Sequence, residues 1–168
     1  MADMAGVGPS GQRVEVAVTE KGEVYEAVHS YSTGLIRISG IGAASAYTAA
    51  DAFGTSGRIP VPKEGTIAFV SFLDYDDEGL NKEIVLFSAP FTATTDNDAF
   101  AVTDDELRLC LGVISISTWY NFSANQVGIS YPTLTYVAPT GFLHYQFVTR
   151  GADNIAAGKS PDFSLVIV

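Results

Sequence analysis

The chain has 168 residues, a length that fits one domain able to bury a core of its own. Hydrophobic residues make up 47% of the sequence and charged residues 17%, which excludes a disordered chain. Nine Lys and Arg stand against nineteen Asp and Glu, and the resulting net charge of −10 would repel a nucleic-acid backbone. DNA and RNA are therefore not expected partners.

The first twelve residues are predicted to form a flexible arm. They contain three glycines, a proline and a serine, and they show no hydrophobic periodicity. No cationic start followed by an apolar run is present, so a secretory signal is not expected. No later apolar stretch reaches the roughly 20 residues that a membrane helix needs. We therefore expect synthesis in a cytoplasm, no membrane partner, and a single β domain over residues 13–168.

Strand patterns begin directly after this arm. Residues 13–18 alternate polar and apolar side chains, and residues 23–29 are the expected partner strand across a turn at residues 20–22. Residues 35–41 are predicted to form a third strand. Residues 42–57 are rich in Ala, Ser, Gly and Thr and lack an apolar stripe, so we expect a long loop there with room for one short helix.

The middle of the chain is predicted to form a hairpin and one helix. Residues 66–73 and 83–87 are rich in aromatic and branched side chains, and the acidic residues 74–79 between them would form the hairpin loop. Thr103 with Glu106 three residues later is the pattern of a capping box. A short helix should begin there and end near Cys110.

The last third of the chain contains five further strand patterns, at residues 112–120, 126–131, 134–137, 142–149 and 163–168. Short strands separated by Gly, Pro or Asn turns indicate a sandwich or barrel rather than alternating β-α units. The sequence therefore predicts an all-β fold. We expect an antiparallel two-sheet sandwich, jelly-roll-like, with one short helix and the flexible N-terminal arm.

The acidic loop is a weak candidate for calcium binding. Asp74, Asp76 and Glu78 alternate as in the start of an EF-hand loop, and Gly79 stands at the position of the sharp turn. The twelfth position should hold a bidentate Glu but holds Val85 instead. A solvated hairpin loop is therefore favoured over a metal site.

No other pattern indicates catalysis or a cofactor. The sequence has no phosphate-binding glycine motif and no nucleophile elbow. His29 and His144 stand alone, and His144 is expected to be a partly buried strand residue. Cys110 is the only cysteine and is expected to be a buried, inert thiol. We therefore predict that the protein is not an enzyme and has no cofactor.

Two segments are predicted to bind partners. Trp119 and Tyr120 lie at the end of a predicted strand, with Tyr131 and Tyr136 nearby in the sequence, and could form a surface cluster. The glycine-rich arm could order on a partner, and its first residues are the candidate contacts: Met1, Ala2, Asp3 and Met4.

Segments of the C-terminal half resemble small structural proteins encoded beside the capsid genes of tailed bacteriophages. They are residues 96–100 followed by 103–107, the strand at 111–116, and residues 142–150 leading to the final 165–168. The resemblance implies a head decoration or cement protein of the virion, which binds the major capsid protein as an oligomer, a dimer or trimer. The alternative is a phage receptor-binding or carbohydrate-binding β-sandwich module.

Overall fold

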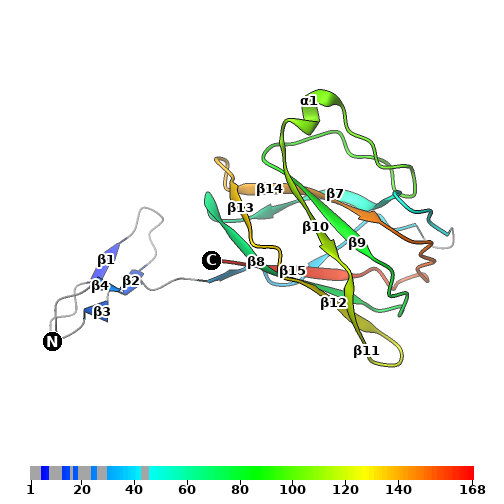
Figure 1. Ribbon diagram of the computed structural model, residues 1–168, viewed down its shortest axis with the longest axis horizontal. Helices are drawn as coiled ribbons and strands as arrows, with labels where there is room; N and C mark the ends of the chain where they lie inside the picture. The colour runs from blue at the N-terminus through cyan, green and yellow to red at the C-terminus, as the bar shows by residue number, and fades with distance from the viewer. Residues whose placement is uncertain (1–4, 8–12, 16, 19–23, 26–29, 43–45) are drawn as a thin grey trace. The chain divides into compact units, whose positions relative to one another are not determined.

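The computed structural model describes residues 5–7, 13–15, 17–18, 24–25, 30–42 and 46–168 (Figure 1). The chain divides into two compact units, Met1–Ser30 and Tyr31–Val168. Among the described residues, no helix is long and apolar enough to cross a membrane.

The first unit contains two short antiparallel strand pairs. They are β1 (Ala5–Val7) with β2 (Arg13–Glu15), and β3 (Ala17–Val18) with β4 (Val24–Tyr25). The predicted pairing of residues 13–18 with residues 23–29 is confirmed for β3 and β4, and the expected turn at 20–22 lies outside the described residues. Strand β1 lies within the expected arm. The division of the chain into this arm and a single domain over residues 13–168 stays a prediction.

The second unit is a sandwich of two antiparallel sheets, which confirms the predicted fold class. The four-stranded sheet has the order β10 (Cys110–Ile116), β9 (Lys82–Phe87), β14 (Phe142–Thr149), β7 (Ala52–Pro60). The seven-stranded sheet has the order β11 (Thr118–Asn121), β12 (Gln126–Ser130), β8 (Glu64–Asp74), β15 (Asp162–Ile167), β5 (Tyr31–Ser32). In this second sheet β13 (Leu134–Val137) also pairs with β8, and β6 (Ile36–Arg37) with β15. Jelly-roll connectivity stays a prediction.

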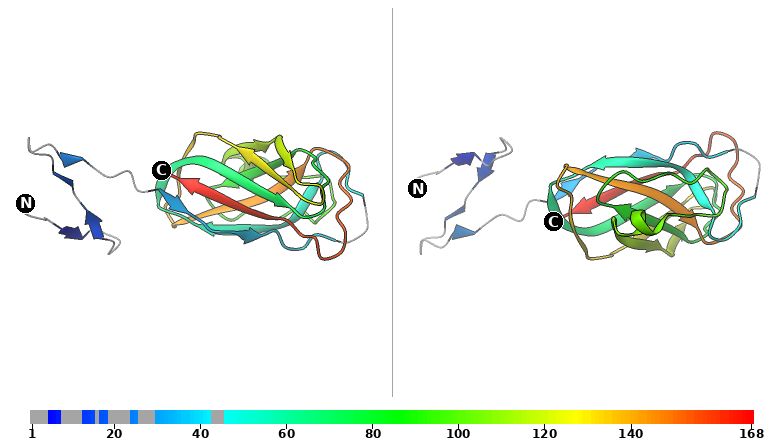
Figure 2. Two further views of the ribbon diagram at one scale, coloured as in Figure 1. Left: turned by 90° about the horizontal axis from the view of Figure 1, so that it is seen from below. Right: turned by 90° about the horizontal axis from the view of Figure 1, so that it is seen from above.

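The long strands β8 and β15 run side by side in opposite directions (Figure 2). Their inward side chains include Phe72 and Phe163, which pair directly across the two strands. Opposite them in the other sheet lies Phe147, whose ring centroid is 5.5 Å from that of Phe72 and 4.9 Å from that of Phe163. Such edge-to-face contacts between fully buried rings fix the two sheets against each other at the centre of the core.

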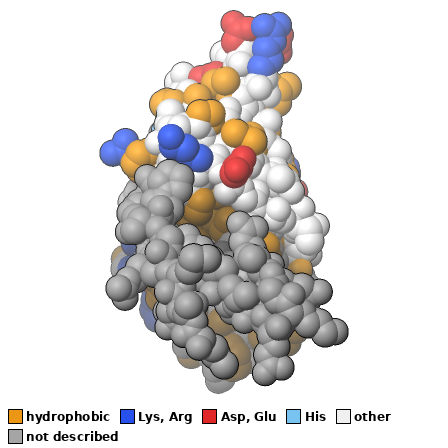
Figure 3. Space-filling model, turned by 90° about the vertical axis from the view of Figure 1, so that its left-hand side faces the viewer, with side chains coloured by type: hydrophobic (Ala, Val, Ile, Leu, Met, Phe, Trp, Pro, Cys, Tyr) orange, Lys and Arg blue, Asp and Glu red, His pale blue; other side chains and the backbone are white. Residues whose placement is uncertain are grey.

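The predicted helix is present as α1 (Asp104–Leu107). The Thr103 side chain accepts a hydrogen bond from the backbone N–H of Glu106, and the Glu106 carboxylate accepts one from that of Thr103. Hydrogen bonds from the backbone of Thr103 and Thr92 lower the pKa of Glu106 to about 2. The helix ends at Leu107, three residues before the expected end. Asp105 and the C-cap residue Arg108 form an ion pair whose side chains are exposed. Figure 3 shows acidic and basic side chains together at the end of this unit where α1 lies.

The expectation of a loop throughout residues 42–57 is wrong, because β7 begins at Ala52. Strand β7 has small residues where β-branched residues would be typical, because large side chains of the neighbouring strand β14 fill the adjacent space. A Cβ atom on Gly57 would lie 2.6 Å from the Tyr145 ring, which occupies that space. The predicted strand at 35–41 is also shorter than expected, with only β6 assigned to it.

The predicted hairpin of residues 66–73 and 83–87 is also wrong. Both segments are strands, but β8 belongs to the seven-stranded sheet and β9 to the four-stranded sheet. The acidic loop therefore carries the chain from one layer to the other. The predicted strand at 112–120 crosses in the same way, because β10 and β11 lie in different sheets. Hydrophobic pattern indicates a strand but does not specify its neighbour.

Candidate functional site

The acidic loop is organised around Asp74, a buried residue at the end of β8. Its Oδ1 accepts a hydrogen bond from the Asp76 N–H at 2.9 Å, and its Oδ2 accepts from the N–H groups of Glu78 at 3.0 Å and Gly79 at 3.2 Å. The Gln126 side-chain amide also donates to Oδ2, at 2.8 Å. The Asp74 carboxylate thus satisfies the backbone donors of a tight turn, as buried Asp residues often do.

The other carboxylates of this loop also bind protein groups. Asp76 accepts the backbone N–H of Ala156 at 2.6 Å, and Glu78 accepts that of Asn154. Burial raises the pKa of Glu78, and the negative charges of Asp153, Asp76 and Asp74 raise it further. Among the described residues, no group of three or more His, Cys, Asp or Glu side chains could hold a metal ion. The three carboxylates of the calcium candidate, Asp74, Asp76 and Glu78, instead accept hydrogen bonds from backbone N–H groups. These bonds connect the end of β8 to the loop after β14.

The predicted aromatic surface cluster is divided by the structure. Trp119 points inward and packs edge-on against Phe72, with 5.8 Å between ring centroids. Its indole N–H is buried and has no hydrogen-bond partner among the described residues. Tyr136 is buried too, whereas Tyr120 and Tyr131 are 53% and 70% exposed. Alternation along β11 explains the split between Trp119 and Tyr120, because neighbouring strand residues face opposite sides of a sheet.

The outer face of the seven-stranded sheet carries exposed aromatic side chains. Tyr131 packs on Phe69 of β8, with ring centroids 5.2 Å apart, and Tyr120 pairs with Val127 of β12. Phe122, in the turn between β11 and β12, is 62% exposed. The partly exposed apolar residues of this open face include Phe69, Leu73, Val127, Ile129 and Val166.

The outer face of the four-stranded sheet is covered instead. Its side chains Val85, Phe87 and Val148 are buried beneath residues from the segment between β9 and β10. The ring of Phe91 stacks on Phe87 with 4.1 Å between centroids. Figure 1 shows this segment, with α1, lying over β14 and β7. Cys110 packs against the same cluster but is only half-buried, so the expectation of a buried thiol is wrong.

Sequence reasoning missed a buried charged cluster around Lys82. This side chain is 1% exposed, and its Nζ lies 2.5 Å from Asp153 Oδ1 and 2.7 Å from the Leu80 carbonyl oxygen. Three aromatic rings surround the same Nζ, at 5.1 to 6.0 Å from their centroids: Phe53, Phe72 and Trp119. Burial lowers the pKa of Lys82 and outweighs the attraction of Asp153, which acts to raise it.

Two adjacent strands bring this cluster together. Lys82 begins β9 directly opposite Thr149, the last residue of β14. Asp153 follows Thr149 by four residues, is fully buried, and accepts a hydrogen bond from the Thr149 hydroxyl at Oδ2. A sequence signal existed, because strand alternation places Lys82 on the same face as the core residues Ile84 and Leu86. No sequence pattern indicated its partner, Asp153, which lies 71 residues further along the chain.

Other predicted positions have less direct roles. His144 is half-buried in β14, as expected, and burial together with the positive charge of Arg58 lowers its pKa. Met1, Ala2, Asp3 and Met4, the candidate contacts of the arm, lie outside the described residues, as does His29.

Comparison with protein-family models, with curated proteins and with solved structures finds no match.

Proposed function

We propose that the protein is a virion structural protein, a decoration or cement protein that binds the major capsid protein and stabilises a phage head as an oligomer. The resemblance of the C-terminal half to capsid-associated proteins motivates this function. The observation that carries it is the unequal covering of the two sheets. One outer face is covered by residues of the chain itself, and the other leaves Tyr120 and Tyr131 exposed.

The open face has the composition of a protein-binding surface. Tyr side chains combine a large apolar ring with a hydroxyl and are enriched where binding energy concentrates. The Tyr131 ring is supported by Phe69 and the Tyr120 side chain stands beside Val127, so both aromatics rest on a rigid sheet. A preorganised surface loses little conformational entropy on binding. At one end of this sheet, β11 is an edge strand, a place where subunits can pair.

The test is co-sedimentation of purified protein with phage heads that lack it. Tyr120→Ala combined with Tyr131→Ala should reduce the bound fraction at least tenfold if the open face binds the capsid. Leu107→Ala is the matched control, since Leu107 is an equally exposed apolar residue on α1. Loss of binding in the control alone, or no binding by the unaltered protein, would contradict the proposal.

The same exposed aromatics favour one alternative, a receptor-binding or carbohydrate-binding module, because sugar rings stack on aromatic faces. A protein that fails to sediment with heads but is retained on immobilised host glycans, with retention lost in the double Tyr variant, would favour this reading. Deletion of residues 2–12 tests the arm separately. It should weaken capsid binding and leave the thermal transition of the free protein nearly unchanged.

A further inference from the structure

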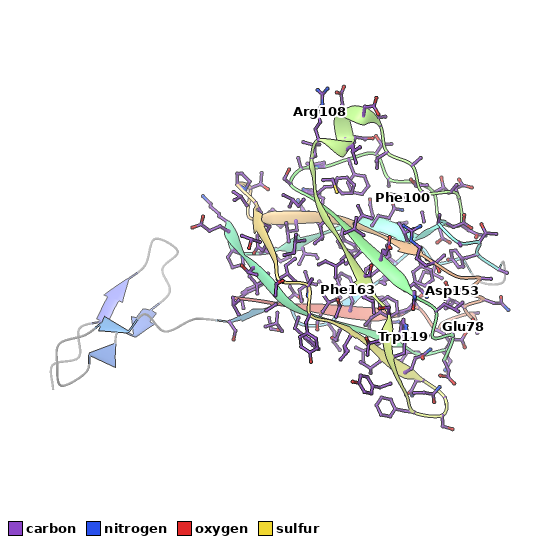
Figure 4. All side chains as sticks on the ribbon, viewed as in Figure 1. Glu78, Phe100, Arg108, Trp119, Asp153 and Phe163 are labelled. Atoms are coloured by element: carbon purple, nitrogen blue, oxygen red, sulfur yellow. The ribbon has the colours of Figure 1, made fainter. Side chains whose placement is uncertain are left out.

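The cluster around Lys82 brings an amine and a carboxyl group into contact in an apolar setting. Lys82 Nζ is 2.5 Å from Asp153 Oδ1, and both side chains are almost completely shielded from solvent, at 2% and 0% exposure. Water is replaced around Nζ by the rings of Phe53, Phe72 and Trp119. In Figure 4 the labelled residues Asp153 and Trp119 lie toward the same end of the second unit. This inference is independent of the proposed capsid function.

The geometry fixes both reacting groups from several directions. The Leu80 carbonyl oxygen accepts a hydrogen bond from Lys82 Nζ, and the Thr149 hydroxyl donates to Asp153 Oδ2. The backbone of Asp153 is held as well, because its carbonyl accepts the N–H of Tyr47 at 2.8 Å. Groups held at contact distance react as if at very high concentration, since the entropy of bringing them together has already been lost on folding.

An apolar setting also favours the reactive forms of the two groups. A buried ion pair is costly to desolvate, and transfer of one proton from the ammonium to the carboxylate gives a neutral amine and a neutral carboxylic acid. The neutral amine has a free electron pair and is a nucleophile, as in other desolvated lysines. Burial lowers the pKa of Lys82, which acts in this direction. The neutral acid is the better electrophile.

We propose that Lys82 and Asp153 condense in the folded protein to form an intramolecular isopeptide bond between Nζ and Cγ. The Nζ electron pair attacks Cγ to form the N–C bond, and the C–O bond to Oδ1, the oxygen that received the proton from Nζ, breaks. The departing hydroxyl takes a proton from Nζ and leaves as water, so one amine and one carboxylic acid become one amide and one water molecule. No oxidant, metal or further reactant is needed, and exclusion of water from the core opposes hydrolysis of the product.

The first test is the intact mass of the unaltered protein, measured under denaturing conditions after it has folded. We expect a mass lower than that of the sequence, after allowance for removal of the initiator methionine, by one water molecule. Lys63→Arg, at an exposed lysine, should keep this loss, whereas Lys82→Arg and Asp153→Ala should show the full sequence mass. A folded, unaltered protein at full sequence mass would overturn the proposal.

Peptide mapping of the unaltered protein gives an answer that does not depend on the folding of any variant. Trypsin cleaves after free lysine, so a modified Lys82 should leave residues 64–108 uncut and joined to residues 151–159 in one branched peptide. Fragmentation should locate the branch at Lys82 and Asp153. Complete cleavage after Lys82 would overturn the proposal. A water loss that persists in Lys82→Arg would also overturn it, because it would indicate a succinimide at an aspartate.

Discussion

Two ion pairs in this protein have the same nitrogen–oxygen distance and very different surroundings. Lys82 Nζ and Asp153 Oδ1 are 2.5 Å apart, with side chains that are 2% and 0% exposed. Arg37 Nε and Asp162 Oδ1 are also 2.5 Å apart, but the arginine side chain is 56% exposed. The first pair lies in the core beside aromatic rings, and the second lies on the outer face of the seven-stranded sheet, where β6 pairs with β15.

The distance between the two charged atoms does not by itself determine how much an ion pair contributes to the free energy of unfolding. Water screens the charge of the exposed Arg37 side chain, and Asp162 keeps a hydrogen bond from the Tyr75 hydroxyl if Arg37 is removed, so the net contribution of this pair is small. The buried charges were desolvated on folding, and removal of either one leaves the other without compensation. Low polarity and exclusion of water also allow the buried pair to react, which the exposed pair cannot do.

The largest effect is expected from Lys82→Met, which removes the buried cation and keeps most of the side-chain volume. Asp153 would then be a buried carboxylate without its cation, and we expect a loss of about 3–5 kcal/mol in the free energy of unfolding. Loss of an isopeptide bond would add to this. Urea denaturation monitored by the fluorescence of Trp119 would measure the change.

Lys63→Met is the matched control, because Lys63 is exposed, and it should change the free energy of unfolding by less than about 0.5 kcal/mol. Equal stability of Lys82→Met and the unaltered protein would show that the buried charges contribute nothing net. The contrast between the two ion pairs would then fail.

Local signals in the sequence predicted the elements that depend on local physics. The capping box at Thr103 and Glu106 is formed as expected, because both hydrogen bonds join residues within one turn. The strands β13 and β14 have the bounds expected from their composition and turns. Strand β7 was missed because Gly57 leaves room for the ring of the distant residue Tyr145, which no local pattern reveals.

Pairing and site geometry could not be predicted, because they depend on contacts between distant parts of the chain. The acidic residues after β8 indicated a hairpin turn, yet Asp74 shapes a crossing between sheets and takes part of its hydrogen bonding from Gln126, 52 residues further on. Trp119 and Tyr120 were grouped by sequence, and strand alternation separates them. The Lys82 cluster required knowledge that Thr149 lies opposite Lys82 in the neighbouring strand.

An intermediate effect is expected from Asp162→Asn. Asp162 accepts hydrogen bonds from Arg37 Nε at 2.5 Å, from Arg37 Nη2 at 3.2 Å and from the Tyr75 hydroxyl at 2.7 Å. An asparagine can accept only part of this set, so we expect a loss of about 1 kcal/mol in the free energy of unfolding. Asp105→Asn, in a largely exposed pair with Arg108, should cost measurably less in the same urea experiment. A loss of stability in Asp162→Asn as large as that in Lys82→Met would contradict this order of effects.

The contribution of Asp162 should depend on pH in a defined direction. Burial opposes its ionisation, but hydrogen bonds from Arg37 and Tyr75 outweigh burial and hold its pKa below the ordinary 3.8. A carboxyl group with a lowered pKa in the folded state stabilises the protein above its unfolded pKa, and this stabilisation is lost as the pH falls through the folded value. The stability difference between the unaltered protein and Asp162→Asn should therefore be constant at neutral pH and shrink below pH 3.8. A difference that grows on acidification would contradict this assignment.

The smallest effect is expected from Arg37→Met, which removes the exposed cation and leaves Asp162 accepting the hydrogen bond from Tyr75. Because Arg37 is largely exposed and Asp162 keeps this hydrogen bond, we expect the melting temperature to fall by about 2 °C or less. Raising the salt concentration to about 1 M shortens the screening length to ~3 Å, which should remove most of this difference. The same salt should change the effect of Lys82→Met very little, because mobile ions cannot enter the core. If salt reduced both effects to the same degree, water and ions would reach Lys82, and burial would not distinguish the two pairs.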